Sequence, residues 1–363
     1  MVDGPINLFD FETAAEKRMA KAEWDYVAGG ATDEVTLRRT RLAYDNIAIR
    51  PRMLAGIKGD VDISLDVLGQ RISAPFMLAP AGGHKRAHPN GELASARAAA
   101  KFGTVLGVSA NASYTIEEIG EAADGPKWFQ CYFYRNRETT VEMVRRAEDA
   151  GYNAICITLD AVWPAKRERN IRNGYRQGAR PNNATMPSAE TTAKFDSGQS
   201  SRGLVDPGAT WDDLAWLRTV TDLPLVFKGI LTGEDAALAR EYGVDGLIVS
   251  NHGGRNLDTT LTTIEALPEV ADAVGGKLQV FLDGGVRRGN DVIKALALGA
   301  DAVLFGRPLF WGLAYDGEDG LGQVLDILRD EMISSMVMGG RKDLASIDAS
   351  FVRQMPDLTP MRP

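Results

Sequence analysis

The sequence predicts an α/β protein, a (β/α)8 TIM barrel with an N-terminal helical extension and a long loop after strand 4. Three observations predict this fold. From Pro75 onward, eight apolar runs alternate with amphipathic runs, which favours a closed parallel barrel over an open doubly wound sheet. Nearly every apolar run ends in polar residues, and about fifty mostly polar residues follow the fourth run. The 363 residues fit a single domain of this kind.

The segment before the barrel, residues 1–74, is expected to be a helical extension. The pattern from about Asn7 to Tyr44 is helical, and Asp33 is a candidate helix N-cap. Residues 50–71 are expected to be extended and irregular, with a candidate β-hairpin around Val61 to Ile72.

The barrel itself is expected over residues 75–340. Its strands are expected at Phe76–Pro80, Thr104–Ser109, Trp128–Tyr134, Ala154–Asp160, Leu225–Ile230, Gly246–His252, Gln279–Gly285 and Ala302–Arg307. The helices are expected at Gly91–Phe102, Ile116–Ala123, Glu138–Ala150, Trp211–Val220, Glu234–Tyr242, Thr263–Ala273, Asn290–Leu298 and about Leu321–Ser334. Two helix starts carry the capping-box pattern, Thr115-x-x-Glu118 and Thr232-x-x-Asp235.

Residues 161–210 are expected to form a lid-like loop. They are rich in Asn, Ser, Gly, Thr and Arg, and a connection this long is commonly a lid or disordered. Because the loop follows the fourth strand, it would lie over the carboxyl face of the barrel, where barrel enzymes place their sites.

The composition limits the classes of partner. A net charge of -8 argues against a nucleic-acid surface or a polybasic membrane anchor. No apolar run approaches the roughly 20 residues that span a bilayer. The first residues lack the apolar core of a secretory signal, and residues 361–363 are not a peroxisomal address. We therefore expect a cytoplasmic protein that binds neither nucleic acid nor membrane.

The two cysteines, Cys131 and Cys156, are not expected to form a disulfide. Cys156 shares strand parity with Thr158, whereas Cys131 is out of phase with Gln130, so the two thiols point to opposite faces of the sheet. Free buried thiols indicate a reducing compartment.

The stretch Gly246–Asp258, GLIVSNHGGRNLD, carries the candidate chemistry. A buried strand delivers His252 and Arg255 at its carboxyl end, three residues apart across a Gly-Gly turn, so both can face one small anionic substrate. His252 would take a proton, and Arg255 would hold a carboxylate. A capped strand end with a solvated arginine would give the same pattern.

Glycine and arginine follow both of the last two strands, in the segments Asp283–Arg288 (DGGVRR) and Gly306-Arg307. Glycines let backbone N–H groups approach an anion closely, and arginines supply charge. Because barrels often bind phosphate with the loops after strands seven and eight, a phosphate tail is expected here. Two tight turns with surface arginines and no bound phosphate would give the same sequence pattern.

Lys228 closes the fifth strand inside the barrel mouth, where a lysine needs a negative partner. It would act either as a Schiff-base lysine or as a cation that stabilises an anionic ring. Neutral side chains at other strand ends suit the edge of a heterocycle, namely Ser109, Gln130, Tyr132 and Thr158. No metal is expected, because the chain has only 3 histidines and two of them lack paired carboxylates.

Together these residues resemble the FMN-dependent α-hydroxy acid oxidase and dehydrogenase family, which includes glycolate oxidase, lactate oxidase and mandelate dehydrogenase. The resemblance extends from about Trp24 to Met338. Its most specific pieces are SNHGGRNLD at Ser250–Asp258, FLDGGVRRGNDVIKALALGADAVLFGRP at Phe281–Pro308, WFQCYFY at Trp128–Tyr134 and ITLD at Ile157–Asp160. It implies that the protein uses FMN to oxidise an L-2-hydroxy acid to the 2-oxo acid, with electrons passing to oxygen or another acceptor.

The resemblance also implies roles for individual residues. His252 would be the base, and Asp160 would hydrogen-bond it and stabilise its imidazolium form. Arg255 and Arg167 would hold the substrate carboxylate, with hydroxyl hydrogen bonds from Tyr26 and Tyr132. Lys228 would stabilise the anionic reduced flavin. The other cofactor-binding residues would be Pro80, Ala81, Gly82, Ser109, Gln130, Thr158 and Ser250 around the flavin, Gly284, Asp283 at the ribityl chain, and Gly285, Arg287, Gly306 and Arg307 at the phosphate.

Some positions depart from the family pattern. Asn111 stands where glycolate-type members tend to carry an aromatic residue, and Val27 stands where many have a second tyrosine. Both would enlarge the pocket or change its polarity, which argues against glycolate as the substrate, while Ala110 matches lactate-oxidase-type members. The expected assembly is a homotetramer or homo-octamer.

Three other functions fit parts of the pattern. A family member could oxidise a C–N or C–OH bond in a biosynthetic intermediate. A binding protein could keep the flavin without the chemistry. A phosphosugar barrel could use Lys228 as a Schiff base.

Overall fold

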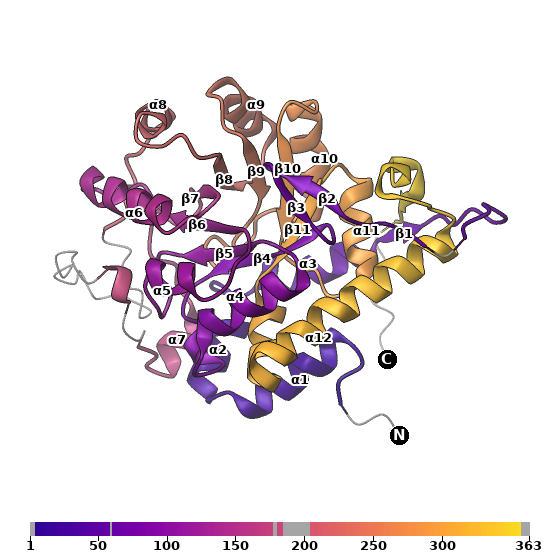
Figure 1. Cartoon of the computed structure of the whole chain (residues 1–363), viewed down its shortest axis with the longest axis horizontal. Helices are drawn as coiled ribbons and strands as arrows, with labels where there is room; N and C mark the ends of the chain where they lie inside the picture. Colours follow the sequence, from indigo (N-terminus) through magenta and orange to yellow (C-terminus); the bar gives the residue numbers. More distant parts are fainter. Residues whose placement is uncertain (1–3, 59, 177–179, 184–203, 357–363) are drawn as a thin grey trace.

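The computed structural model describes residues 4–58, 60–176, 180–183 and 204–356. Its centre is a closed barrel of eight parallel strands wrapped by helices, which confirms the predicted fold class (Figure 1). The strands follow one another around the barrel in chain order, and the last strand pairs with the first to close it.

The barrel elements lie close to their predicted positions. The strands are β4 (Phe76–Ala81), β5 (Leu106–Ser109), β6 (Lys127–Cys131), β7 (Ala154–Thr158), β8 (Leu225–Ile230), β9 (Gly246–Val249), β10 (Gln279–Asp283) and β11 (Ala302–Phe305). The covering helices are α4 (Gly91–Phe102), α5 (Ile116–Glu121), α6 (Arg137–Asp149), α8 (Asp212–Arg218), α9 (Gly233–Glu241), α10 (Thr263–Val274), α11 (Gly289–Ala297) and α12 (Arg307–Gly339). Within the described ranges, no helix has the length and apolar character needed to cross a membrane.

The last helix begins earlier than predicted. It starts at Arg307 instead of near Leu321, with Pro308 in its first turn, where proline is favoured. Its two halves meet at Asp316 and Gly317, whose backbone is not helical. This kink interrupts the apolar period, so the sequence pattern showed only the second half.

Five strands end two or three residues earlier than predicted, at Cys131, Thr158, Val249, Asp283 and Phe305. The chain leaves the extended conformation just after these ends, with a φ of 57° at His252 for example. The polar residues that follow the strands therefore lie in loops at the barrel mouth.

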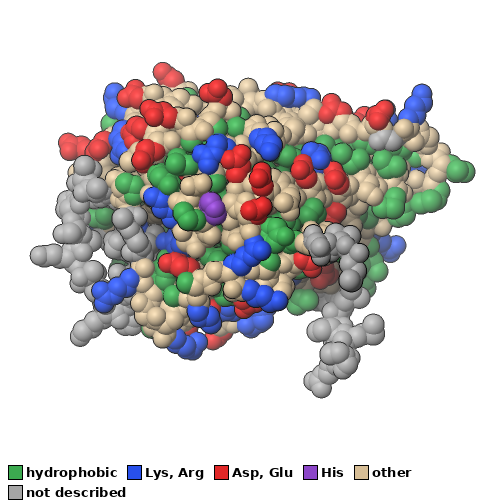
Figure 2. All heavy atoms as spheres, turned by 60° about the horizontal axis from the view of Figure 1, so that its bottom comes forward, with side chains coloured by type: hydrophobic (Ala, Val, Ile, Leu, Met, Phe, Trp, Pro, Cys, Tyr) green, Lys and Arg blue, Asp and Glu red, His purple; other side chains and the backbone are tan. Residues whose placement is uncertain are grey.

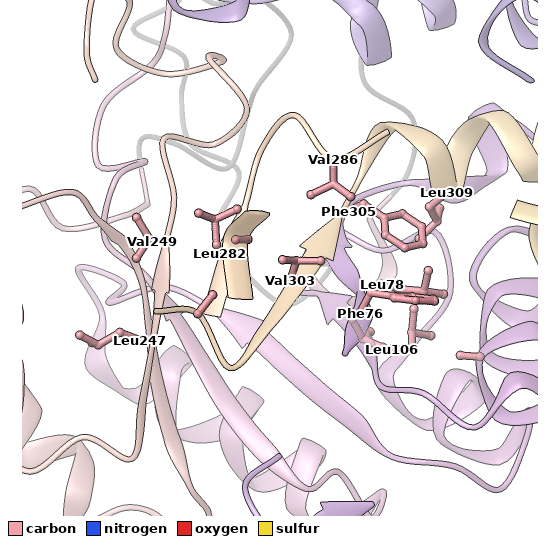
Figure 3. Close-up of a cluster of buried hydrophobic side chains, with 14 of the residues drawn as sticks. Phe76, Leu78, Leu106, Leu247, Val249, Leu282, Val286, Val303, Phe305 and Leu309 are labelled. Atoms are coloured by element: carbon pink, nitrogen blue, oxygen red, sulfur yellow. The ribbon is translucent and has the colours of Figure 1, made fainter. Parts of the chain in front are cut away.

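Alternate side chains along each strand face the barrel interior or the surrounding helices. On β4, Met77 and Ala79 belong to the interior cluster, whereas Phe76 and Leu78 pack against the helices. Figure 3 shows these outward side chains beside Phe305 of β11. The interior is thus filled by side chains below the mouth, and the open space lies above them.

The two cysteines lie on opposite faces of the sheet, as predicted. Cys156 belongs to the interior cluster and Cys131 to the outer one, and both are free and buried. Burial raises the pKa of both thiols, that of Cys156 to about 12. Both are therefore protonated and poorly nucleophilic at neutral pH.

The N-terminal extension folds as three helices, α1 (Leu8–Arg18), α2 (Lys21–Ala28) and α3 (Val35–Asp45). Helix α1 packs along α12 at the lower edge of Figure 1, and α3 packs against α10. A short strand, β1 (Ile47–Ile49), then pairs with β12 (Val352–Gln354) from the C-terminal part of the chain. The extension is therefore clamped onto the outside of the barrel.

The predicted N-cap at Asp33 is wrong. The residue before α3 is Glu34, in a left-handed conformation and without a side-chain cap. Asp258, from the loop after β9, caps this helix instead by accepting hydrogen bonds from the N–H groups of Val35 at 3.1 Å and Thr36 at 2.8 Å. A cap from so far along the chain leaves no local sequence signal.

The predicted hairpin forms as β2 (Leu65–Val67) and β3 (Gln70–Ile72). Val67 and Ile72 join the interior cluster of the barrel, and the N–H of Leu68 donates to the side-chain carbonyl of Gln279 at 2.7 Å. The hairpin therefore covers the amino end of the barrel, opposite the mouth.

The capping boxes formed to different extents. Thr115 and Glu118 bond reciprocally at the start of α5. Thr232 accepts from the N–H of Asp235 at 3.3 Å, but the Asp235 side chain makes no return bond to the N–H of Thr232. Short 3₁₀ turns complete the fold at η1 (His84–Arg86), η2 (Pro181–Asn183), η4 (Leu344–Ser346) and η5 (Ala349–Phe351).

The long loop after β7 is described only in part. It includes α7 (Glu168–Arg172) and η2, and an isolated bridge between Tyr134 and Val205 ties its far end to the segment after β6. Much of the predicted lid at 161–210 lies outside the described residues, so a lid function stays a prediction.

Candidate active site

The carboxyl ends of the barrel strands surround a cavity of about 1200 Å³, its open mouth included. Most of the predicted site residues line it: Tyr26, Pro80, Ala81, Gly82, Ser109, Gln130, Tyr132, Thr158, Arg167, Lys228, His252, Arg255, Asp283, Gly284, Gly285, Gly306 and Arg307. Asp160 and Ser250 lie behind the wall and bond to residues that line it. Arg287 stacks on Trp311, with its guanidinium carbon 4.5 Å from the ring centre.

His252 lies against Asp160, which follows β7. Nδ1 of His252 is 2.9 Å from Oδ1 of Asp160. Because the carboxylate accepts this bond, Nδ1 carries the proton and Nε2 keeps its lone pair. Burial, partly opposed by the Asp160 charge, lowers the pKa of His252 to about 4. The imidazole is therefore neutral at neutral pH and able to accept a proton.

Lys228, Ser250 and Asp283 form a buried network at the ends of three neighbouring strands. Nζ of Lys228 donates to Oγ of Ser250 at 2.8 Å and lies 3.3 Å from Oδ2 of Asp283. Ser250 donates to Oδ1 of Asp283 at 2.7 Å. Burial disfavours the ammonium, but the Asp283 carboxylate outweighs it and raises the pKa of Lys228. The amine is thus protonated, which does not suit a Schiff-base nucleophile.

Two arginines lie beside the ring of Tyr26. The guanidinium carbon of Arg255 is 4.9 Å from the ring centre, and that of Arg167 is 5.8 Å away. Nη1 of Arg255 donates to the carbonyl oxygens of Tyr26 at 2.6 Å and Gly29 at 2.9 Å. Nε of Arg167 donates to the carbonyl oxygen of Arg255 at 3.0 Å. Backbone carbonyls therefore fix both charges at the wall that carries Tyr26.

Tyr26 is surrounded by positive charge. Burial alone would raise its pKa, but the guanidinium groups of Arg86, Arg167, Arg255 and Arg180 lower the pKa of Tyr26 to about 7. The phenol is therefore close to half ionised at neutral pH. Such a field attracts an anion to this end of the cavity.

Neutral groups line another wall of the cavity. Ser109 donates to the side-chain carbonyl of Gln130 at 2.9 Å, and the Gln130 amide donates to the carbonyl oxygen of Cys131 at 2.9 Å. Oγ1 of Thr158 is buried and bonds to no protein atom of the described residues. An orphaned buried hydroxyl is uncommon, so a polar ligand edge fits this wall. The described ranges hold no group of three or more His, Cys, Asp or Glu that could bind a metal ion.

Glycine backbone and a helix N-terminus form the opposite end. Gly284 and Gly285 have φ values of 97° and 85°, which only glycine adopts without strain. Gly306 is the N-cap of α12, and a Cβ there would meet nothing nearer than Ala79 at 4.0 Å. The N–H groups at this helix start are thus accessible to an anion.

Two arginines add charge to this end, Arg287, which is buried, and Arg307, which is partly buried. Nε of Arg307 donates to the carbonyl oxygen of Val27 at 3.0 Å, and Nη2 donates to Gly253 at 3.0 Å. Burial lowers the pKa of Arg307 to about 9 and that of Arg287 to about 10, so both remain charged at neutral pH. The predicted phosphate residues therefore meet at one end of the cavity, with Arg287 one layer behind.

The cavity also includes residues that the sequence analysis missed, among them Arg180, Val205, Gly253 and Phe310. Gly253 could have been found from its place in the Gly-Gly turn. Arg180 and Val205 come from the long loop, where no hydrophobic period indicates which side chains point inward. Asn111, noted as a departure, lines the cavity and donates to the hydroxyl of Tyr132 at 3.4 Å.

Comparisons with known proteins show which family this chain belongs to. Residues 15–354 match the family model described as FMN-dependent dehydrogenase. Glycolate oxidase 3 of Arabidopsis thaliana is 43% identical over 355 residues, covering 96% of this chain and 95% of that protein. L-lactate oxidase of Nostoc sp. is 42% identical over 361 residues, covering 97% and 99%. The crystal structure of mandelate oxidase with (S)-4-hydroxymandelic acid is similar at a TM-score of 0.90 and 38% identity, covering 97% of this chain and 99% of that one.

Proposed function

This chain belongs to the FMN-dependent dehydrogenase family, and we propose that it oxidises an (S)-2-hydroxy acid to the 2-oxo acid with His252 as the base and oxygen as the electron acceptor. The protein is an FMN-dependent oxidoreductase. The observation that carries the proposed roles is the neutral His252–Asp160 pair, which opens on the same cavity as a glycine-rich, arginine-bearing anion site.

The residues of the cavity fit FMN. Its phosphate would be held by the start of α12 with Gly285, Gly306, Arg307 and Arg287. Its ring would meet the neutral wall of Ser109, Gln130 and Thr158, where the Thr158 hydroxyl needs a partner. Pro80, Ala81, Gly82, Ser250, Asp283 and Gly284 would complete the cofactor site, with Lys228 as the buried cation. When bound, FMN accepts the two electrons that the oxidation releases.

His252 supplies the base. Nε2 takes the proton of the substrate, and the imidazolium that results lies 2.9 Å from the Asp160 carboxylate, which stabilises it. The protein thereby places a proton acceptor and a compensating charge together in a partly buried position, where their interaction is stronger than in water.

Arg255 and Arg167 hold the substrate carboxylate. Backbone carbonyls already orient both guanidinium groups, so little side-chain freedom is lost when the anion binds. Tyr26 and Tyr132 line the same part of the cavity and would donate hydroxyl hydrogen bonds. The carboxylate is thus fixed beside His252, which orients the reacting carbon.

The proposal is tested by anaerobic mixing of the yellow protein with a panel of (S)-2-hydroxy acids, followed by admission of oxygen. We expect at least one acid to bleach the flavin and oxygen to restore its colour within a turnover. A panel that leaves the flavin oxidised would reject the proposal. Slow recolouring would reject oxygen and leave a dehydrogenase that uses another acceptor.

The alternative functions are less well supported. The relatives are oxidases of 2-hydroxy acids by name, which does not favour a C–N bond or a biosynthetic intermediate. The neutral His252 and its Asp160 partner argue against a flavin-binding protein without chemistry. The protonated Lys228 argues against a Schiff-base barrel.

We further propose that the protein is cytoplasmic and assembles as a homotetramer or homo-octamer. The two buried thiols support a reducing compartment. Light scattering of the purified holoprotein tests the assembly, and a monomer at micromolar concentration would overturn it.

A further inference from the structure

We propose that the preferred substrate is a 2-hydroxy dicarboxylate, and that Arg180 binds its second carboxylate. This inference rests on the proposed function and names the substrate class of the same site. It depends on three observations, namely the state of Arg180, the balance of charge in the cavity, and the contrast with a neighbouring arginine.

Arg180 brings an unsatisfied guanidinium to the cavity wall. It lines the cavity, and both Nε and Nη1 are buried without a hydrogen-bond partner among the described residues. It is near enough to Tyr26, Tyr132 and Tyr134 to interact with them electrostatically. Burying a charged donor without a hydrogen-bond partner is unfavourable, and an anionic ligand that accepts from Arg180 would remove this penalty.

Arg86 shows what a structural arginine looks like in the same neighbourhood. Its guanidinium carbon lies 4.1 Å from the centre of the Tyr26 ring, and Arg86 does not line the cavity. It donates to the hydroxyl of Tyr175 at 2.6 Å and to the carbonyl oxygen of Gly83 at 2.9 Å, and it pairs with Glu23 at 3.1 Å. Arg86 is therefore satisfied by the protein, whereas Arg180 is not.

The charges that line the cavity exceed what one carboxylate and FMN need. The lining cations are Arg167, Arg180, Lys228, Arg255 and Arg307, and the lining carboxylate is Asp283. Asp283 pairs with Lys228, the phosphate end uses Arg307, and the carboxylate next to the reacting carbon uses Arg167 and Arg255. Of the lining cations, Arg180 alone has no anion assigned to it. On the face shown in Figure 2, by contrast, acidic and basic side chains are interspersed.

A second carboxylate is the anion that matches this surplus. The guanidinium of Arg180 carries one positive charge, and its planar donors suit a planar carboxylate. The polar wall at Asn111 and Tyr132 admits such a tail better than an apolar one. The substrate would thus have one carboxylate at Arg255 and Arg167 and the other at Arg180, with the hydroxyl-bearing carbon at His252.

The test measures the turnover of four acids by the holoprotein. (S)-2-Hydroxybutanedioate is compared with its ω-amide, whose far end is uncharged, and with the monoacid (S)-2-hydroxybutanoate. (S)-2-Hydroxypentanedioate varies the distance between the two carboxylates. We expect kcat/KM for one of the diacids to exceed that for the amide and the monoacid by about 10- to 100-fold, mainly through KM. Arg180→Met should reduce the diacid-to-monoacid ratio by a similar factor, and Arg180→Lys should restore part of it. Arg176→Met, at an exposed arginine of the same loop, should leave the ratio unchanged.

Binding gives a second readout that does not depend on turnover. Unreactive butanedioate or pentanedioate should perturb the flavin spectrum at lower concentration than butanoate, and Arg180→Met should abolish the difference. The inference is overturned if Arg180→Met lowers kcat/KM equally for the diacid and the monoacid. It is also overturned if the wild-type protein prefers the acids that lack a second carboxylate. If a monoacid bleaches the flavin while no diacid is favoured, only this inference fails. If no hydroxy acid bleaches it, the proposed function fails.

Discussion

Arg255 and Arg307, which follow different strands of the barrel, both donate hydrogen bonds to the carbonyl oxygen of Gly29, at 2.9 and 3.0 Å. Gly29 ends α2, so both guanidinium groups lie at the negative end of that helix dipole. The helix that carries Tyr26 is thereby held by the same side chains that are proposed to bind substrate and phosphate.

Replacing Arg255 by Met should strongly weaken substrate binding while the flavin is retained. The substrate carboxylate loses a charged partner, and we expect KM to rise by about 10- to 100-fold or more. Because the end of α2 also loses hydrogen bonds, the thermal midpoint should fall as well. Steady-state kinetics and absorbance of the bound flavin measure both effects. A variant with normal KM would remove Arg255 from the substrate site.

The pH profile of kcat/KM should be bell-shaped. His252 must be neutral to accept a proton, so activity rises above its pKa of about 4. Tyr26 must be protonated to donate a hydrogen bond, so activity falls above its pKa of about 7. Stopped-flow flavin reduction over this range measures both limbs. Tyr26→Phe should lose the alkaline limb, and a variant that keeps it would show that another group titrates there.

His252→Gln should remain yellow yet reduce its flavin about 100- to 10,000-fold more slowly. Glutamine can still bond to Asp160 but cannot take a proton. Anaerobic single-turnover mixing measures the loss directly. If reduction proceeds at the normal rate, His252 is not the base.

Lys228→Met should destabilise the protein by about 3 to 5 kcal/mol, because it leaves the buried Asp283 carboxylate without its cation. Urea unfolding followed by circular dichroism measures this. The double variant Lys228→Met with Asp283→Asn should recover part of the loss. Two single variants whose effects simply add would show that the pair is not coupled.

Asp258→Ala should cost about 1 to 2 kcal/mol through loss of the cap on α3. Asp33→Ala, at the cap that the sequence predicted, is the matched control and should change stability by less than about 0.5 kcal/mol. Burial raises the pKa of Asp258, but hydrogen bonds from Thr36, Thr259 and Val35 outweigh this and hold it at about 2. The stabilisation is therefore complete above about pH 4 and disappears as the pH falls toward 2. Urea titrations at several pH values check both points.

The parts of the fold that the sequence predicted well depend on local pattern. Barrel strands such as β8 begin as continuous apolar runs, and the polar residues at their ends meet because parallel strands finish at one edge. The positions of His252, Lys228 and Arg307 around one cavity follow from this pattern. The placement of Cys131 and Cys156 on opposite faces of the sheet follows from the alternation of side chains along a strand.

The parts that it predicted poorly depend on distant contacts. Asp258 caps α3 across more than two hundred residues, and no neighbouring residue signals this. Arg180 lies in a polar loop where arginines at 172, 176 and 180 look alike in sequence, and only the last lines the cavity. The kink near Asp316 hid half of α12 because it breaks the helical period.

The dependence of α2 on arginines from the barrel has a consequence for engineering. Tyr26 lines the cavity because α2, which precedes the barrel in the chain, lies at the mouth of the barrel. The eight-stranded unit is thus not a detachable catalytic module. Removing the first thirty or so residues should impair folding as well as turnover, because Leu8, Phe11 and Trp24 pack into the main core. A transplanted barrel must therefore include these first helices.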